Sequence, residues 1–419
     1  MRPLLLSYSD IEGGAARAAY RLHQSLLNQG IDSRMRVRSA RSGEWQIEGP
    51  AGRLAKLTNS LRTPAGSLLT RWQSSTNHNL RSINGLPSRW STAINASKFD
   101  VVNLHWVAGE ALSIEDIGRI GKPIVWTLHD MWPFSGAEHY GPDDDGARWR
   151  EGYSAANRPA GSHGLDLDRW VWWRKGRVWR RPMHIVAPSR WLAQCAKESA
   201  LFAGWPVTVI PNPLDTATYR PHQRRMAREL LGLPQDREIV LFGAIGGSSD
   251  PRKGHDLLAR ALGRVAASRI AERMLCVVFG QAEPKRSAEL PLPTRWLGHL
   301  HDDLSLALLY SAADVMVVPS RQENLPQTAT EAQACGCPVV AFNCTGLPDA
   351  VVHEQTGYLA AAHDPDALAE GILWLLRDEA LRHRVGDAAR ERAVRLWSAQ
   401  TIAERYLEAF LSTVREQPK

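Results

Sequence analysis

Short apolar segments alternate with stretches of helical periodicity along the first half of the chain. The apolar segments have the length of strands and end in polar residues: PLLLSYS (3–9), DVVNLHW (100–106), PIVWTLHD (123–130) and HIVAPS (184–189). After the first of them, residues 13–30 carry apolar side chains at helical spacing and end at Gly30. This repeated strand–loop–helix order predicts a parallel sheet with helices on both faces.

A second series of the same kind follows a proline cluster at 206–213. Its strand-like segments are EIVLFGA (238–244), MLCVVFG (274–280), DVMVVPS (314–320) and PVVAF (338–342). The pattern predicts an α/β chain with two doubly wound Rossmann-like domains, 1–205 and 206–396, and a terminal amphipathic helix over 397–419. In such sheets ligands bind outside the carboxyl ends of the strands, so the loops after the strands should carry the chemistry.

Composition narrows the class of protein. The chain has 419 residues, of which 44% are apolar and 23% charged, as expected for a globular protein with two cores. The net charge of +7 is compatible with an acidic partner such as a phosphate ligand. Five cysteines without a Cys-x-x-Cys pair argue against disulfides or structural zinc and favour a cytoplasmic protein. No apolar run reaches 18 residues, and MRPLLLSYSD does not read as a signal peptide.

The segment SRQENLPQTATEAQACGCPVV (320–340) is the first candidate for a site. Pro326 suits the start of a helix and Gly336 its end, so the helix N-terminus would face a ligand at the strand ends. Glu323 precedes this helix, and Glu331 lies inside it. A glutamate there could accept hydrogen bonds from two ribose hydroxyls. Alternatively, Glu331 is a solvated helix carboxylate and Glu323 a helix cap.

Two glycine-containing loops are further candidates. In GAIGGSSDPRKGHDLL (243–258), Arg252 and Lys253 could neutralise a diphosphate, or they could be solvated cations of a surface turn. Gly13 and Gly14 would allow the backbone to approach a ligand, or they form a turn without one. His105 and Trp106 end a strand, so they could contact an acceptor or pack in the core.

The segment 168–181 combines tryptophans with cations: Arg169, Arg174, Lys175, Arg177, Arg180 and Arg181. It could rest on the anionic inner face of a membrane, or it could be a helix that packs its tryptophans on the sheet. No motif supports nucleic-acid binding. RMRVR (34–38) reads as a strand with one solvated face, and PDDDG (142–146) as a solvated turn.

The order of these motifs resembles that of the family-4 retaining glycosyltransferases, which have the GT-B fold. Gly13-Gly14, TLHD, VAPSRWLA, VIPNPLD, DPRKG and QENLPQTATEAQACGCPVVAF carry the resemblance, which covers nearly the whole chain. HDMWPFSG and QENLPQTATEA are most similar to the exopolysaccharide (colanic-acid type) transferases. The resemblance implies two domains facing across a cleft, with the C-terminal helix returning to the N-terminal domain.

The resemblance also implies a role for each candidate residue. Glu331 would hold the ribose of a nucleotide-diphosphate sugar, and Glu323 and His129 would lie at the transferred sugar as catalytic residues. The remaining donor contacts would come from Arg252, Lys253, Asn324 and Leu325, and Gly13 and Gly14 would form the diphosphate and acceptor loop. The chain departs from the family pattern at Ala244, where many members have arginine, at Thr345, where glycine is common, and after WPFSG, where the usual cysteines are missing.

The function implied is that of a metal-independent, retaining hexosyltransferase without a cofactor. No Asp-x-Asp stands in a loop after a strand, where a metal–diphosphate bridge would need it. The donor would be a UDP- or GDP-sugar and the acceptor a glycan or polyprenyl-linked glycan of surface polysaccharide, with a cytoplasmic enzyme at the inner face of the membrane. Two alternatives stay open: a nucleotide-sugar epimerase of the same architecture, and a non-catalytic nucleotide-sugar-binding subunit.

Overall fold

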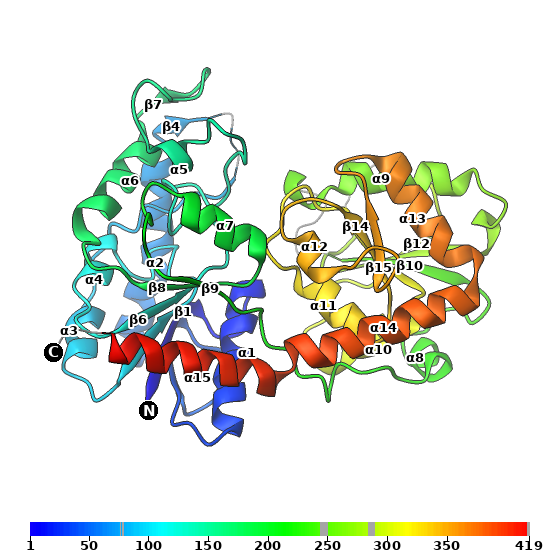
Figure 1. Ribbon diagram of the computed structural model, residues 1–419, viewed down its shortest axis with the longest axis horizontal. Coiled ribbons are helices and arrows are strands. Elements are labelled where there is room, and N and C mark those ends of the chain that lie inside the picture. The colour runs from blue at the N-terminus through cyan, green and yellow to red at the C-terminus, as the bar shows by residue number, and fades with distance from the viewer. Residues whose placement is uncertain (76, 78, 244–249, 284–289, 417–419) are drawn as a thin grey trace. The chain divides into compact units, whose positions relative to one another are not determined.

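The computed structural model describes residues 1–75, 77, 79–243, 250–283 and 290–416. The chain forms two compact units (Figure 1). The first comprises Met1–Ile210 with Ile402–Lys419, and the second comprises Pro211–Thr401. The sequence placed the first boundary at residue 206 and the start of the terminal segment at 397. Each unit is built on its own parallel sheet.

The first unit has a seven-stranded parallel sheet in the order β3-β2-β1-β5-β6-β8-β9. Its strands are β1 (Pro3–Ser9), β2 (Arg34–Ser39), β3 (Ile47–Glu48), β5 (Val101–Leu104), β6 (Ile124–Thr127), β8 (His184–Ala187) and β9 (Val207–Val209). A separate antiparallel pair joins β4 (Gln73–Ser74) to β7 (His163–Gly164). Strand order reverses between β1 and β5, so the loops after these two strands lie at a switch point.

Helices cover both faces of this sheet. They are α1 (Gly14–Asn28), α2 (Gly52–Thr70), α3 (Trp90–Asn95), α4 (Ile114–Gly118), α5 (Arg148–Glu151), α6 (Leu167–Val178), α7 (Arg190–Glu198) and α15 (Ala399–Arg415). Leu5 of β1 packs in one core with α1 and α15, whereas Leu4 and Leu6 pack in the core of the opposite face. The alternation follows from the strand pleat, which sends successive side chains to opposite faces.

The second unit has a six-stranded parallel sheet in the order β12-β11-β10-β13-β14-β15. Its strands are β10 (Glu238–Gly243), β11 (Met274–Phe279), β12 (Thr294–Trp296), β13 (Val315–Val318), β14 (Val339–Phe342) and β15 (Gly357–Ala360). The chain runs outward from β10 to one edge, then returns to the middle and runs from β13 to the other. The loops after β10 and β13 therefore meet at a second switch point, where ligands of open α/β sheets bind.

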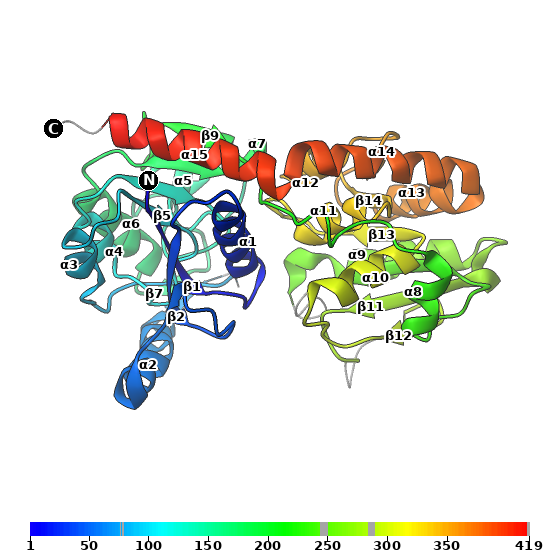
Figure 2. The same ribbon diagram turned by 90° about the horizontal axis from the view of Figure 1, so that it is seen from below.

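The helices of the second unit also lie on both faces of its sheet (Figure 2). They are α8 (Arg224–Leu230), α9 (His255–Ala266), α10 (Asp303–Ala312), α11 (Gln327–Ala334), α12 (Leu347–Ala350), α13 (Pro365–Arg377) and α14 (Glu379–Trp397), with short 3₁₀ helices η1 (Pro251–Lys253) and η2 (Ala271–Arg273). Helix α9 packs against α13, while α10 packs against α8 and α11. One continuous apolar core joins these elements.

The predicted α/β class and both doubly wound sheets are confirmed. RMRVR forms most of β2, in which Met35 and Val37 are buried while the arginines alternate with them. The terminal helix belongs to the first unit: Tyr406 and Phe410 of α15 are buried in its core, and Tyr406 Oη lies 3.0 Å from Thr127 Oγ1. Ala244, at which the chain departs from the family pattern, lies outside the described residues.

Helix α15 offers a matched pair of substitutions that tests its packing. Phe410 is fully buried, whereas its neighbour Leu411 is 42% exposed. We expect Phe410→Ala to lower the free energy of unfolding by about 3–5 kcal/mol, because it leaves a cavity. Leu411→Ala should change it by less than about 1 kcal/mol. Urea titration of both variants measures the difference, and equal losses would show that α15 is not docked as described.

Candidate functional site

The loop after β13 brings the predicted donor residues to the switch point of the second sheet. Strand β13 ends at Val318, and α11 begins at Gln327. Between them, Glu323, Asn324 and Leu325 are all buried. Glu323 is therefore held inside the protein and is not a solvated residue at the entrance of the helix.

Lys253 and Glu323 form an ion pair between the loops that follow β10 and β13. Ser320 Oγ donates a 3.2 Å hydrogen bond to the same Glu323 oxygen. The interpretation of Lys253 as a solvated cation is therefore wrong, because its ammonium is engaged with a buried carboxylate. The interpretation of Glu323 as a helix cap also fails, because its carboxylate is directed to Lys253 and Ser320.

Backbone contacts fix the two loops against each other. Gly254 has φ +67°, and a Cβ there would lie 1.9 Å from the Pro319 carbonyl oxygen, so only glycine fits. Arg321 N–H donates a 2.7 Å hydrogen bond to the Arg252 carbonyl. The Arg252 side chain, in contrast, forms an ion pair with Asp250 at 2.6 Å. Lys253 thus faces Glu323, while the Arg252 guanidinium is occupied within its own turn.

A third loop, after β14, supports Glu323 from behind. Thr345 has φ +50°, a region that favours glycine, and its Oγ1 accepts a 3.1 Å hydrogen bond from Glu323 N–H. Gly346 N–H donates to the Glu323 carbonyl at 3.0 Å, and a Cβ at Gly346 would lie 1.5 Å from the Asn324 carbonyl oxygen. The threonine that departs from the family pattern therefore holds the Glu323 backbone. From the sequence alone, Thr345 is only a difference from the family pattern.

Glu331 lies in α11 and is buried, so it is not a solvated helix carboxylate. Tyr310 Oη of α10 donates a 2.9 Å hydrogen bond to its Oε2. Burial, followed by the nearby Glu331 charge, raises the pKa of Tyr310 well above its usual value, so the phenol stays a donor. Pro326 and Gly336 bound the helix as the sequence indicated. Tyr310 is a supporting residue that the sequence analysis did not identify.

In the first unit, His129 follows β6 and begins a hydrogen-bond chain through the sheet. Its Nε2 lies 3.0 Å from His105 Nδ1, and His105 Nε2 lies 2.9 Å from Asn103 Oδ1. Asn103 Nδ2 donates to the Val125 carbonyl at 3.0 Å, which fixes its amide orientation. His105 must then donate to Asn103 and accept from His129. The network therefore leaves His129 Nδ1 as an unprotonated acceptor.

Burial keeps both imidazoles neutral. It lowers the pKa of His129 to about 4, although Asp130 acts in the opposite direction. Burial and then the neighbouring His129 lower the pKa of His105 well below its usual value. The sequence left open whether His105 contacts an acceptor or packs in the core. His105 is buried and orients His129, so its role is structural. A neutral His129 can accept a hydrogen bond from a substrate hydroxyl at pH 7.

Asp130 and His139 form an adjoining buried pair that the sequence analysis missed. His139 Nδ1 lies 2.6 Å from Asp130 Oδ2, and the Trp106 indole donates to the same oxygen at 2.8 Å. Although burial raises the pKa of Asp130, these bonds and the Trp132 N–H lower it overall. Trp106 is thus fixed by a carboxylate. Asp130 stands in the HDMWPFSG motif, but nothing in the sequence pattern paired it with His139.

The segment 168–181 is largely the helix α6, and two of its cations are buried. Lys175 donates to the carbonyls of Trp132, Ser135 and Gly136, and Arg174 pairs with Glu115 at 2.7 Å. Lys175 therefore fixes the loop that follows His129. The exposed cations and tryptophans of the segment are Arg169, Trp170, Trp173, Arg177, Arg180 and Arg181. The membrane hypothesis is thus restricted to these residues.

The glycine pair lies at the start of α1. Gly13 precedes the helix with φ +88°, and Gly14 is its first residue. Asp10 anchors the same loop by accepting from Arg41 N–H at 2.9 Å and Ser42 N–H at 2.8 Å. The PDDDG turn is exposed, with Asp143 paired to Arg150. Within the described ranges, no three His, Cys, Asp or Glu side chains gather where they could hold a metal.

The low pKa of His129 makes a prediction about acid stability. An unfolded histidine titrates near 6.5 and His129 near 4, so the unfolded chain binds the extra proton between these values. Stability should therefore fall as the pH drops from about 6.5 to about 4, by up to roughly 1.4 kcal/mol per pH unit for this one group. Above pH 6.5, the His129 contribution should be constant.

The measurement is urea unfolding at several pH values for the wild type and His129→Gln. The variant should lose part of the slope between pH 6.5 and 4.5, because it no longer takes up the proton on unfolding. His163→Gln, at an exposed histidine, should keep the full slope. An unchanged slope in His129→Gln would contradict a neutral, half-buried imidazole at this position.

Comparison with known proteins agrees with this arrangement. The chain matches the family models Glycosyltransferase Family 4 over residues 12–218 and Glycosyl transferases group 1 over residues 224–392. The D-inositol 3-phosphate glycosyltransferase of Xylanimonas cellulosilytica is 33% identical over 347 residues, which cover 76% of this chain and 73% of that protein. The chain spans only about half the length of several other matching D-inositol 3-phosphate glycosyltransferases.

Solved structures show the same fold at low identity. Sucrose-phosphate synthase from Thermosynechococcus elongatus superimposes with a TM-score of 0.69 at 19% identity, covering 99% of this chain and 100% of that chain. Anabaena HepE, in complex with UDP and glucose, gives 0.64 at 18% identity, covering 98% and 100%. The named relatives do not support the exopolysaccharide branch in particular. The chain belongs to the family-4, group 1 glycosyltransferases, with their GT-B fold, and is a glycosyltransferase enzyme.

Proposed function

We propose that this enzyme transfers a sugar from a UDP-sugar to an acceptor hydroxyl with retention of the anomeric configuration, without a metal or other cofactor. The observation that carries the proposal is the Lys253–Glu323 pair at the switch point of the second sheet, with Glu331 buried on the helix that follows. A UDP donor is favoured over GDP because UDP is the nucleotide bound by HepE.

Each donor residue then has a physical task. Lys253 neutralises the diphosphate, and the N-terminal amides of α11 with the backbone of Asn324 and Leu325 add to the positive field. Glu331 accepts hydrogen bonds from the ribose hydroxyls. Arg252 contributes to diphosphate binding only if the diphosphate displaces Asp250, the carboxylate with which it is paired. Glu323 lies at the sugar, held by Lys253, Ser320 and Thr345.

The reaction follows from stabilising the leaving group. The bond between C1 of the sugar and the diphosphate oxygen breaks, and its electron pair stays on the diphosphate, where Lys253 stabilises the added charge. The acceptor oxygen bonds to C1 on the same face, and its proton passes to the leaving phosphate oxygen. His129 Nδ1 accepts a hydrogen bond from a sugar hydroxyl and so fixes the sugar for attack. Gly13 and Gly14 let the loop backbone approach the diphosphate and the acceptor.

Thermal unfolding with UDP, GDP and ADP tests the donor site. A nucleotide at about 100 times its dissociation constant adds roughly 2.7 kcal/mol of stability. We expect UDP to raise the melting temperature of the wild type and this shift to be lost in Glu331→Ala and reduced in Glu331→Gln, which can still accept from Tyr310. Glu370→Ala, at an exposed glutamate of α13, should keep the shift. If no nucleotide raises the melting temperature, the proposed donor site is wrong. Turnover of a UDP-sugar into a second nucleotide sugar without an acceptor would favour the epimerase.

We further propose that the acceptor is a membrane-linked glycan of surface polysaccharide, reached through one face of the first unit. Helix α2 supports this because it packs with its polar side inward. Asn59 donates to the Arg38 carbonyl, Thr63 to the Gly109 carbonyl at 2.9 Å, and Arg62 to the Glu110 carbonyl at 2.9 Å. Its apolar side chains are left in solvent: Leu54, Leu57, Leu61, Leu68 and Leu69.

Exposed apolar side chains also occur near the start of α6. The β4–β7 pair joins the end of α2 to the start of α6, where Trp72, Leu165 and Trp170 are exposed. Residues 49–99 contain no acidic side chain and seven cations. An apolar stripe flanked by cations suits an anionic lipid surface. No helix in the described part of the chain is long and apolar enough to cross a membrane.

Vesicle binding tests the membrane face. The double variant Leu57→Gln/Leu61→Gln should bind phosphatidylglycerol vesicles less than the wild type in sedimentation, and salt should weaken the binding of both. Leu304→Gln, at an exposed leucine of α10 in the second unit, should bind as the wild type does. Equal binding by all three proteins would show that α2 does not contact the membrane. The same assay on Trp170→Gln/Trp173→Gln decides whether α6 contributes.

A further inference from the structure

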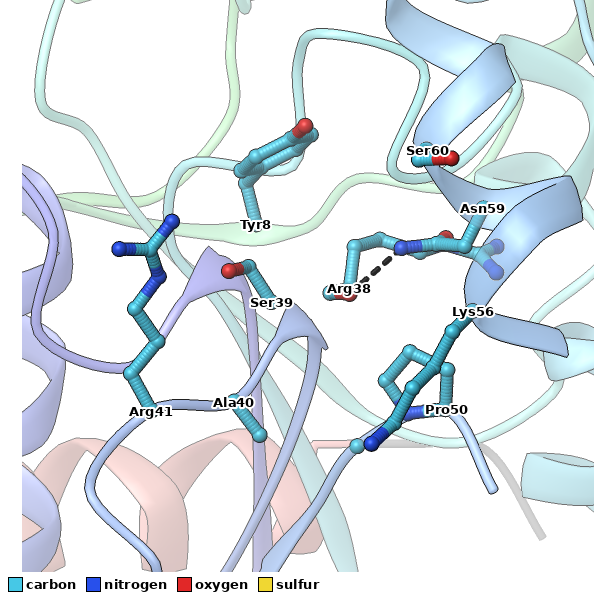
Figure 3. Close-up of a pocket in the computed structure, with 10 residues that line it drawn as sticks. Tyr8, Arg38, Ser39, Ala40, Arg41, Pro50, Lys56, Asn59 and Ser60 are labelled. Atoms are coloured by element: carbon cyan, nitrogen blue, oxygen red, sulfur yellow. Dashed lines mark hydrogen bonds between the residues drawn. The ribbon is translucent and has the colours of Figure 1, made fainter. Parts of the chain in front are cut away.

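A pocket of about 570 Å³ is lined by residues of the first unit (Figure 3). Its walls include Tyr8 from the end of β1, Arg38 and Ser39 from the end of β2, and Lys56 and Asn59 from α2. It therefore opens at the carboxyl ends of two strands beside the switch point, where ligands of such sheets bind. Its volume suits a small ligand or the head of a larger one.

The pocket is basic. Arg38, Arg41 and Lys56 all contribute to its lining, and no acidic residue does. Arg41 pairs with Glu12 at 2.9 Å, but both side chains are substantially exposed, so the pair is weak. Lys56 is exposed and lies on the side of α2 that borders the pocket. Among the described residues, at least one full positive charge of the lining is therefore left without a carboxylate, which suits an anionic ligand.

The deepest cation is incompletely bonded. The Arg38 guanidinium stacks on Trp90 at 4.0 Å, and its Nε donates to the Ala111 carbonyl at 2.8 Å. Its Nη2 and the Asn59 Oδ1 are buried without a hydrogen-bond partner in the described part of the chain. Burial, followed by the nearby Arg62 charge, lowers the pKa of Arg38 to about 10. A bound anion would offset the cost of burying this charge.

The pocket shares a wall with the glycine loop. Ser39 Oγ donates to Glu12 at 3.3 Å, and the Arg41 N–H bonds to Asp10, so the loop that ends at Gly13 borders the cations. Figure 3 shows Arg41 and Lys56 on opposite sides of the opening, with the Tyr8 hydroxyl above it. A ligand in the pocket would thus lie next to the loop assigned to the acceptor.

We propose that this pocket binds a phosphate group carried by the acceptor and thereby selects anionic acceptors over neutral ones. The inference rests on the proposed function, because it takes the first unit as the acceptor side. The phosphate could belong to a soluble phosphorylated polyol or to a polyprenyl-phosphate-linked glycan. Both offer the same chemistry to Lys56 and Arg41, which would hold the phosphate oxygens by charge-assisted hydrogen bonds.

Calorimetric binding with three probes tests the proposal: glycerol 3-phosphate, geranyl phosphate, and uncharged glycerol. We expect at least one phosphate probe to bind and glycerol not to. Lys56→Gln and Arg41→Gln should each weaken that binding about tenfold or more, the usual effect of losing one charged contact. Lys98→Gln, at an exposed lysine outside the pocket, should bind as the wild type does. Tighter binding of geranyl phosphate would indicate a lipid-linked acceptor, and tighter binding of glycerol 3-phosphate a soluble one.

UDP binding, measured on the same preparations, separates this proposal from the proposed function. If UDP binds but no phosphate probe binds at millimolar concentration, the anion pocket is wrong and the donor site stands. Phosphate binding that is equally strong in both pocket variants would also overturn the proposal. A urea-unfolding transition of Lys56→Gln and Arg41→Gln that matches the wild type shows that the first unit, which carries both substitutions, is folded.

Discussion

The close contact between the loops after β10 and β13 is the constraint on which the donor site depends. Reversal of strand order brings these loops together, and Gly254 lets one of them pass against the Pro319 carbonyl. Without that approach, Lys253 could not reach Glu323. Separating the Lys253 ammonium from the buried Glu323 carboxylate would be costly. The pair therefore keeps the Lys253 ammonium at the place where a diphosphate would need a positive charge. Preorganised charge of this kind stabilises a leaving group without moving.

The first unit uses the same principle with neutral groups. The chain of hydrogen bonds from His129 through His105 and Asn103 orients one imidazole. Thr127, which bonds to Asn103, also contacts Tyr406 of α15, so the terminal helix supports the same strand ends. Lys175 holds the loop after His129 from the other side. In both units, contacts with neighbouring side chains therefore hold the site residues in place: Lys253 with Glu323, and His129 with His105.

The sequence predicted the two sheets because their strands are buried on both faces and read as uninterrupted apolar runs. It also predicted the helix that carries Glu331, since Pro326 and Gly336 mark its ends. It could not predict partners that are distant in the chain, such as Tyr310 with Glu331 or His139 with Asp130, because one sequence carries no information on such pairings. The basic tryptophan segment was misleading for a related reason. Its composition left open a membrane contact or a helix packed on the sheet, and it could not show that Lys175 would be buried.

The most direct test of the donor site is a crystal structure of the enzyme with a UDP-sugar. The present account predicts that the ribose hydroxyls lie within hydrogen-bonding distance of the Glu331 carboxylate and that the diphosphate contacts Lys253. A nucleotide bound elsewhere, or one whose diphosphate leaves the Lys253–Glu323 pair untouched, would contradict it.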